Sequence, residues 1–144
     1  MRFKEGKIGR VFLVTFSHGE DFLSGIKEFV KSKNVKFGTI NIIGAFVSAE
    51  IVTGPIKKAC PPEPDFRKFD DAREVLGFGF LTNPEGDVNL HLHGAIGKGD
   101  STVVGCLRKG GEVFVTIEAL ITEIDNIQAK RYLDDKTNCN LLEF

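Results

Sequence analysis

Apolar and polar residues alternate along most of the chain with the two-residue period of extended strands. One segment departs from that period: from Phe22 to Val30, apolar residues recur at spacings of three and four, and lysine and glutamate fill the opposite side. That segment predicts the one main helix. The runs that predict strands are residues 10–16, 37–43, 46–52, 74–82, 88–96, 102–104 and 113–124. Many strands joined by short turns around one helix predict an α+β fold with a largely antiparallel sheet.

The helix has a start signal and a stop signal. Ser17 to Glu20 has the spacing of a capping box, in which the serine oxygen accepts a free backbone N–H and the glutamate reaches back. Asn34 is a plausible end of the helix. Further on, Gly44-Ala45 separates two apolar runs, which either pair as a hairpin or form one strand with a glycine kink.

Three other segments break the strand pattern. Residues 54–71 carry four prolines and predict a long surface loop. Gly110-Gly111 predicts a turn that leads into the strand at 113–124. The tail, residues 126–144, is expected to add one or two short edge strands.

Composition narrows the class of protein. The 144 residues, 42% of them hydrophobic, predict a single domain over residues 1–144 with its core at about 8–125. Nineteen basic and twenty acidic residues argue against a dedicated nucleic-acid binder, although a local basic patch stays open. Three widely spaced cysteines, no apolar N-terminal run and no long apolar stretch lead us to expect a cytoplasmic protein without a membrane partner.

The clearest candidates for metal ligands lie in the predicted strand Val88–Gly94. His91 and His93 share one face of it, because side chains two residues apart on a strand point the same way. Two imidazoles at this spacing can converge on one zinc ion. The alternative is a polar strand face with two solvated histidines, and the spacing alone does not decide between the two.

A third metal ligand near His91 and His93 would decide between a zinc site and a polar strand face. Cys106 follows His93 after one hairpin-sized connection and is a good zinc ligand as thiolate, or else a buried and inert cysteine. His18 is a second candidate, although its place near the helix start favours a structural role. Glu118, in mid-strand, is either a solvated side chain or a group that orients an imidazole.

Together these residues resemble the plant-and-prokaryote (PPC) domain family. The resemblance covers roughly residues 8–125 and is most specific around Leu90–Gly94. The matching segments are Gly19–Asp21, Gly38–Ala45, Glu74–Leu76, Leu90–Gly94, Val104–Leu107 and Val115–Ile121. Where the family often has Gly-Gly-His-Leu, this chain has Val104-Gly105-Cys106-Leu107.

The resemblance implies a homotrimer with the fold of a PPC domain, which looks like that of acetolactate decarboxylase, a zinc enzyme. The residues themselves lead to the hypothesis of a metal or small-ligand site on His91, His93 and Cys106, with zinc as the candidate ion and Glu118 as the candidate catalytic group, which would orient a ligand or transfer a proton. Cys106 in place of the family's histidine would either keep the zinc affinity or abolish it. A second implied function is that of a trimeric DNA-binding or regulatory protein, although the chain has no R-G-R-P core of an AT-hook. A third is a zinc-dependent lyase or decarboxylase-like enzyme, and a trimeric scaffold without a site is the remaining alternative.

Overall fold

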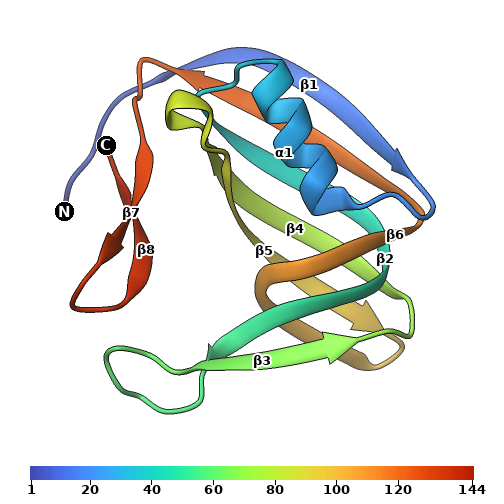
Figure 1. Ribbon diagram of the computed structural model, residues 1–144. Helices are drawn as coiled ribbons and strands as arrows, with labels where there is room; N and C mark the ends of the chain where they lie inside the picture. The colour runs from blue at the N-terminus through green and yellow to red at the C-terminus, as the bar shows by residue number, and fades with distance from the viewer.

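The computed structural model describes residues 1–144 as eight strands, one α-helix and one short 3-10 helix (Figure 1). In chain order the elements are β1 (Lys7–Ser17), α1 (Phe22–Ser32), β2 (Phe37–Pro55), β3 (Pro64–Phe69), β4 (Arg73–Thr82), η1 (Pro84–Gly86), β5 (Asn89–Lys98), β6 (Ser101–Asp125), β7 (Lys130–Asp134) and β8 (Cys139–Glu143). No helix has both the length and the apolar character needed to cross a membrane.

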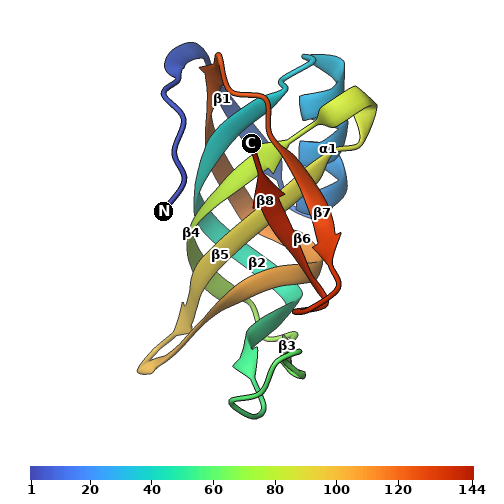
Figure 2. The same ribbon diagram turned by 90° about the vertical axis from the view of Figure 1, so that its left-hand side faces the viewer.

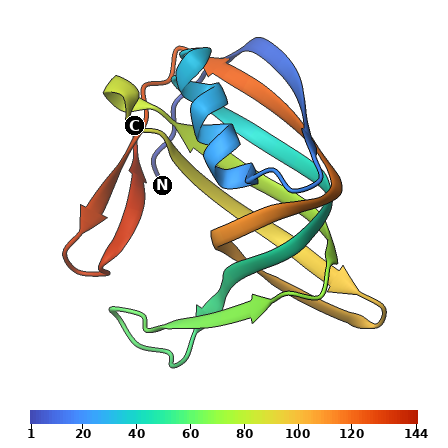
Figure 3. The ribbon, with the colours of Figure 1, turned by 45° about the vertical axis from the view of Figure 1, so that its right-hand side comes forward.

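Six strands form one antiparallel sheet in the order β1-β6-β5-β4-β2-β3. The long strand β6 also pairs with β2, so that β2, β4, β5 and β6 close into a ring, with α1 packed across one side (Figures 1 and 3). The expected fold class, a largely antiparallel α+β sheet with one main helix, is confirmed.

Glycines bend the two longest strands. The segment around Gly44 is one continuous strand, β2, and Gly44 has a φ of 131°, which an L side chain rarely adopts. This confirms the kinked strand over the hairpin. The turn expected at Gly110-Gly111 is wrong: both glycines have positive φ, but β6 continues through them and pairs with β2 on either side. They form a bulge because β2 supplies partners for both halves of β6.

Helix α1 begins one residue after Asp21, whose carboxylate accepts a hydrogen bond from the backbone N–H of Ser24 at 2.7 Å. Asp21 is therefore the N-cap, and the prediction of Ser17 in that role is wrong. Glu20 does reach back, but it accepts the N–H of Ser17 in the preceding turn. The helix ends at Ser32, close to the expected stop at Asn34. Phe22, Ile26 and Val30 on its apolar face are 0% exposed, and full burial stabilises the fold by about 1.5–3 kcal/mol for each large side chain. Leu23 and Phe29 on the same helix are partly buried.

The proline-rich segment and the C-terminal tail both differ from the structure expected for them. Within the proline-rich segment, residues 64–69 form β3 and pair with β2, so only part of residues 54–71 is loop. The tail forms a hairpin, β7–β8, that pairs only with itself and stands apart from the main sheet (Figure 1). The expected edge strands therefore exist, but in a separate two-stranded sheet.

One ion pair joins β1 to β6. The guanidinium of Arg10 donates to both carboxylate oxygens of Glu123, at 2.6 and 2.9 Å, and to the carbonyl of Lys33 at the end of α1. The hydrogen bonds from Arg10 hold the pKa of Glu123 below its ordinary value of 4.5. The pair therefore stabilises the fold above pH 4.5, and this contribution is lost as the pH falls through the lower pKa of the folded state.

We expect Glu123→Gln to lower the midpoint of thermal unfolding by a few degrees at pH 7 and to have a smaller effect at pH 3, because protonation of the carboxylate at low pH removes the ion pair. Thermal unfolding followed by circular dichroism at the two pH values measures this. The control is Glu112→Gln on the same strand, which removes an exposed carboxylate without an ion pair. An equal loss at pH 3 and pH 7 would contradict the assignment.

Candidate metal centre

Strand β5 places two imidazoles on the outer face of the sheet. Leu92 points into the core and is only 1% exposed, so His91 and His93 on either side of it point outward. On the neighbouring strand β4, Phe80 is in register with His91 and Phe78 with His93. The phenylalanines limit the space on that side of the imidazoles.

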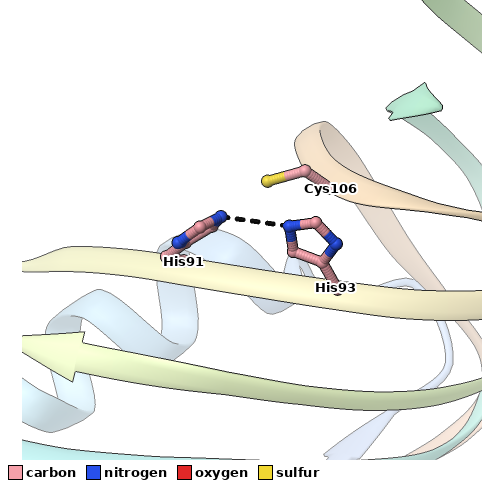
Figure 4. Close-up of side chains that lie close together, drawn as sticks. All are labelled: His91, His93 and Cys106. Carbon is pink, nitrogen blue, oxygen red and sulfur yellow. Dashed lines mark hydrogen bonds between the residues drawn. The ribbon is translucent and has the colours of Figure 1, made fainter. Parts of the chain in front are cut away.

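The β5–β6 hairpin brings Cys106 to the same place. Residues 99–100 form the tight turn, and the antiparallel register that follows sets Cys106 directly opposite His93. Directly opposite residues point to the same face of a sheet. The three side chains therefore converge from two strands, as Figure 4 shows. Cys106 is 4% exposed, His91 is half-buried and His93 is exposed.

The distances suit a single ion. The Nε2 atoms of His91 and His93 lie 3.1 Å apart, and the ligand atoms of His91, His93 and Cys106 all lie within 4.8 Å of one another. A tetrahedral zinc ion with ordinary bond lengths separates two nitrogen ligands by about 3.3 Å and a nitrogen from a sulfur by about 3.6 Å. The nitrogens are already close to that spacing, and the sulfur needs a shift of at most about 1.2 Å.

Burial sets the protonation of the cluster. It lowers the pKa of His91 to about 4, with smaller contributions from the positive charge of Arg131 and from His93 and Arg108. The His91 ring is therefore neutral at pH 7. In the absence of a metal its Nε2 shares a hydrogen bond with Nε2 of His93, and a bound cation would replace the proton between them. Burial also raises the pKa of the Cys106 thiol, against the opposing effect of the same two arginines. The thiol keeps its proton at neutral pH until a cation displaces it.

Comparison with known protein families assigns the chain to one of them. The model of the Plants and Prokaryotes Conserved (PCC) domain matches residues 3–125. The chain belongs to this family. It is the plant-and-prokaryote family that the sequence resembles, and β7–β8 lies beyond the end of the PCC match.

Solved structures share the PCC fold over the whole chain. A metal-containing protein from Archaeoglobus fulgidus is 23% identical with a TM-score of 0.86, and 100% of each chain is covered. A plant- and prokaryote-conserved protein from Pyrococcus horikoshii is 24% identical with a TM-score of 0.82, covering 100% of this chain and 99% of that one. A protein from Bacteroides thetaiotaomicron, provisionally named as DNA-binding, is 20% identical with a TM-score of 0.77, covering 98% and 99%. Comparison with curated proteins gives no match.

The PCC fold does not bring Glu118 or His18 to the cluster. Glu118 is exposed on the same outer face, but β2 and β4 lie between it and β5, a separation of roughly 14 Å. It lines a separate open hollow together with Glu74 and Thr116. Nδ1 of His18 instead accepts the backbone N–H of Val115 at 3.3 Å, and its ring packs edge-on against Phe114.

Sequence reasoning missed Arg131 altogether. It lies in β7, outside the PCC match, and no motif marks it. Its positive charge acts on both His91 and Cys106, and the guanidinium is itself partly buried. The β7–β8 hairpin projects from the side of the molecule seen in Figure 2, in front of β5 and β6. The charge of Arg131 thus acts on the cluster although its strand belongs to a separate two-stranded sheet.

The burial of Cys106 and its raised pKa predict slow alkylation. In metal-free protein at pH 7, we expect a variant with Cys106 as its only cysteine (Cys60→Ser, Cys139→Ser) to react with iodoacetamide about tenfold more slowly, or slower still, than a matched variant that keeps only exposed Cys60. Mass spectrometry of timed samples measures both rates. Equal rates would show that the Cys106 thiol is open to solvent.

Proposed function

We propose that this PCC-domain protein binds zinc through His91, His93 and Cys106 and uses the remaining coordination position for a small ligand. The observation that carries the proposal is the convergence of two imidazole nitrogens and one thiol from β5 and β6 within 4.8 Å. The fit is chemical as well as geometric, because imidazole and thiolate are the donors that zinc prefers. A relative with the same fold, from Archaeoglobus fulgidus, is described as metal-containing.

Three protein ligands leave one position of a tetrahedral ion open, which is typical of catalytic rather than structural zinc sites. In such a position zinc polarises a carbonyl oxygen or lowers the pKa of a bound water. The protein residues have separate tasks. His91 and His93 would each supply a ring nitrogen to the ion, Cys106 would supply its sulfur as a thiolate after losing its proton to solvent, and Phe78 and Phe80 lie opposite the two imidazoles on β4.

Assembly as a homotrimer forms part of the proposal, and the outer face of the sheet supports it. Strand register places six large apolar side chains on the same face as His93, and each of them is between 43% and 73% exposed. They are Leu13, Ile43, Leu76, Phe78, Val104 and Leu120; we call them the outer apolar face. A continuous exposed face of this kind marks a surface that another chain covers. Assembly would also be needed for Glu118 to act at a cluster, since one chain holds it too far away.

DNA binding is the other function that the comparisons raise, through the provisional name of the Bacteroides thetaiotaomicron protein. The basic residues of β3 and its neighbours are already paired with carboxylates: Arg67 with Asp65, Arg73 with Asp71, and both Lys68 and Lys109 with Glu50. Paired cations gain less from binding phosphates. We therefore place the metal site ahead of DNA binding for this chain.

Zinc stoichiometry tests the ligand assignment. We expect one zinc per chain in the wild type after gel filtration, none in the His91→Ala/His93→Ala variant, and binding about tenfold weaker, or weaker still, in Cys106→Ser, because the serine hydroxyl stays protonated. Cys106→His, which restores a nitrogen donor, should keep the ion. Elemental analysis and competition with a chromophoric chelator measure these values.

The matched control is His18→Ala, which removes an imidazole outside the cluster and should leave zinc binding unchanged. Circular dichroism confirms that each variant is folded. Full zinc content in the His91→Ala/His93→Ala variant would overturn the proposed site.

Oligomeric state tests the outer apolar face. We expect the wild type to have three times the mass of one chain in solution, and Leu76→Glu, in the middle of the face, to yield folded monomers, because it would bury a charge at each contact. Light scattering after gel filtration measures the mass. Leu133→Glu, an exposed leucine on β7, is the control and should leave the trimer intact. A monomeric wild type would refute the assembly.

A further inference from the structure

The proline-rich loop between β2 and β3 contacts the tip of the C-terminal hairpin through a cysteine (Figures 1 and 3). The thiol of Cys60 donates to the carbonyl oxygen of Lys136, with Sγ 3.5 Å from that oxygen, although 76 residues separate the two in the chain. No backbone hydrogen bond joins the loop to the hairpin. The sulfur of Cys60 is therefore a point of contact between two segments that are otherwise held separately.

A second cysteine belongs to the same end of the hairpin. Cys139 lies three residues beyond Lys136, at the far side of the turn that joins β7 to β8. The N–H of Asn138 closes this turn by donating to the carbonyl of Asp134 at 2.7 Å. A stretch of three residues spans at most about 10 Å, and less where it is folded into a turn. Cys139 is therefore close to the carbonyl that the loop contacts.

Both sulfurs are accessible, and both segments are held by few contacts. Cys60 is exposed and Cys139 is partly exposed, whereas Cys106 is buried. Every residue from 55 to 64 is exposed, and the hairpin pairs only with itself. Segments with so few buried contacts rearrange at a low cost in free energy. A disulfide needs Cα atoms about 5.5–6 Å apart, a spacing that a modest shift of the exposed loop would provide.

We propose that Cys60 and Cys139 form a reversible disulfide, which fastens the C-terminal hairpin to the β2–β3 loop when a low-molecular-weight disulfide serves as oxidant. The thiolate of Cys60, the more exposed of the two, attacks one sulfur of the small disulfide and releases one small thiol. The thiolate of Cys139 then attacks the sulfur of Cys60 and releases the second small thiol. Two protein thiols and one small disulfide thus become one protein disulfide and two small thiols.

The bond would tether the hairpin at its tip as well as at its base, where the chain arrives from β6. In a reducing compartment such disulfides are transient and respond to the redox state, and small thiols reverse them. The proposal is therefore a redox-sensitive fastening of the hairpin. It is independent of the proposed zinc site, because Cys106 takes no part in it.

The test uses Cys106→Ser, in which only Cys60 and Cys139 remain. We expect oxidised glutathione to lower the mass of the chain by about 2 Da, the mass of two hydrogens, and an unreduced tryptic digest to link residues 59–67 to residues 137–144. In mixtures of reduced and oxidised glutathione, the equilibrium constant for the disulfide should be about tenfold larger, or larger still, in native buffer than in concentrated guanidinium chloride, because the fold holds the two sulfurs together. Wild-type protein in native buffer should give the same linked peptides.

Cys60→Ser and Cys139→Ser, each made in the wild type, should show no loss of about 2 Da after the same treatment. The matched control is Cys106→Ser/Cys139→Ser/Asn140→Cys, which moves the thiol by one residue to the opposite face of β8 and should lower the native equilibrium constant about tenfold. Equal constants in native and denatured protein, or in Cys106→Ser and the matched control, would overturn the inference. So would linked peptides that contain Cys106, or oxidation that yields only chain-to-chain dimers or glutathione adducts.

Discussion

The antiparallel register between β5 and β6 is the constraint on which the candidate site depends. It sets Cys106 opposite His93, and the two-residue period of β5 adds His91 on the same face. A shift of one residue in this register would turn the thiol into the core and leave two imidazoles without a third donor. The short turn between the strands and the pairing of β6 with both β5 and β2 fix the register from two sides.

The alternation of side chains along each strand gives the sheet an inner and an outer surface with different roles. The inner surface packs with α1 into the core, where Phe22 contacts the rings of Phe16 and Phe46. The outer surface keeps the donors of the cluster and the outer apolar face side by side. A large exposed apolar face is unfavourable in water and marks a surface that another chain covers. Because the candidate metal site lies on this same face, assembly and ligand binding belong to one proposal.

Local patterns in the sequence were sufficient for most strands of the main sheet, for the helix and for the pair His91 and His93, because each depends on residues near in the chain. They missed β3, because its pairing with β2 overrides the loop signal of the proline-rich segment. Cys106 could be named as a third donor because only one tight turn separates it from His93. The glycines at Gly44 and at Gly110-Gly111 did not show from sequence whether a strand turns or continues. In the structure both strands continue with a bend, because the pairing of β2 with β6 extends across both positions. Arg131 could not be found in advance, because its approach to the cluster depends on how the C-terminal hairpin packs.

X-ray absorption at the zinc edge, on purified wild-type protein, tests the central claim most directly because it reports the donors around the ion. The account predicts four-coordinate zinc with two nitrogen scatterers at about 2.0 Å, one sulfur at about 2.3 Å and one further light atom. A spectrum with nitrogen and oxygen scatterers alone, or with six light ligands, would contradict it, since Cys106 would then lie outside the coordination sphere.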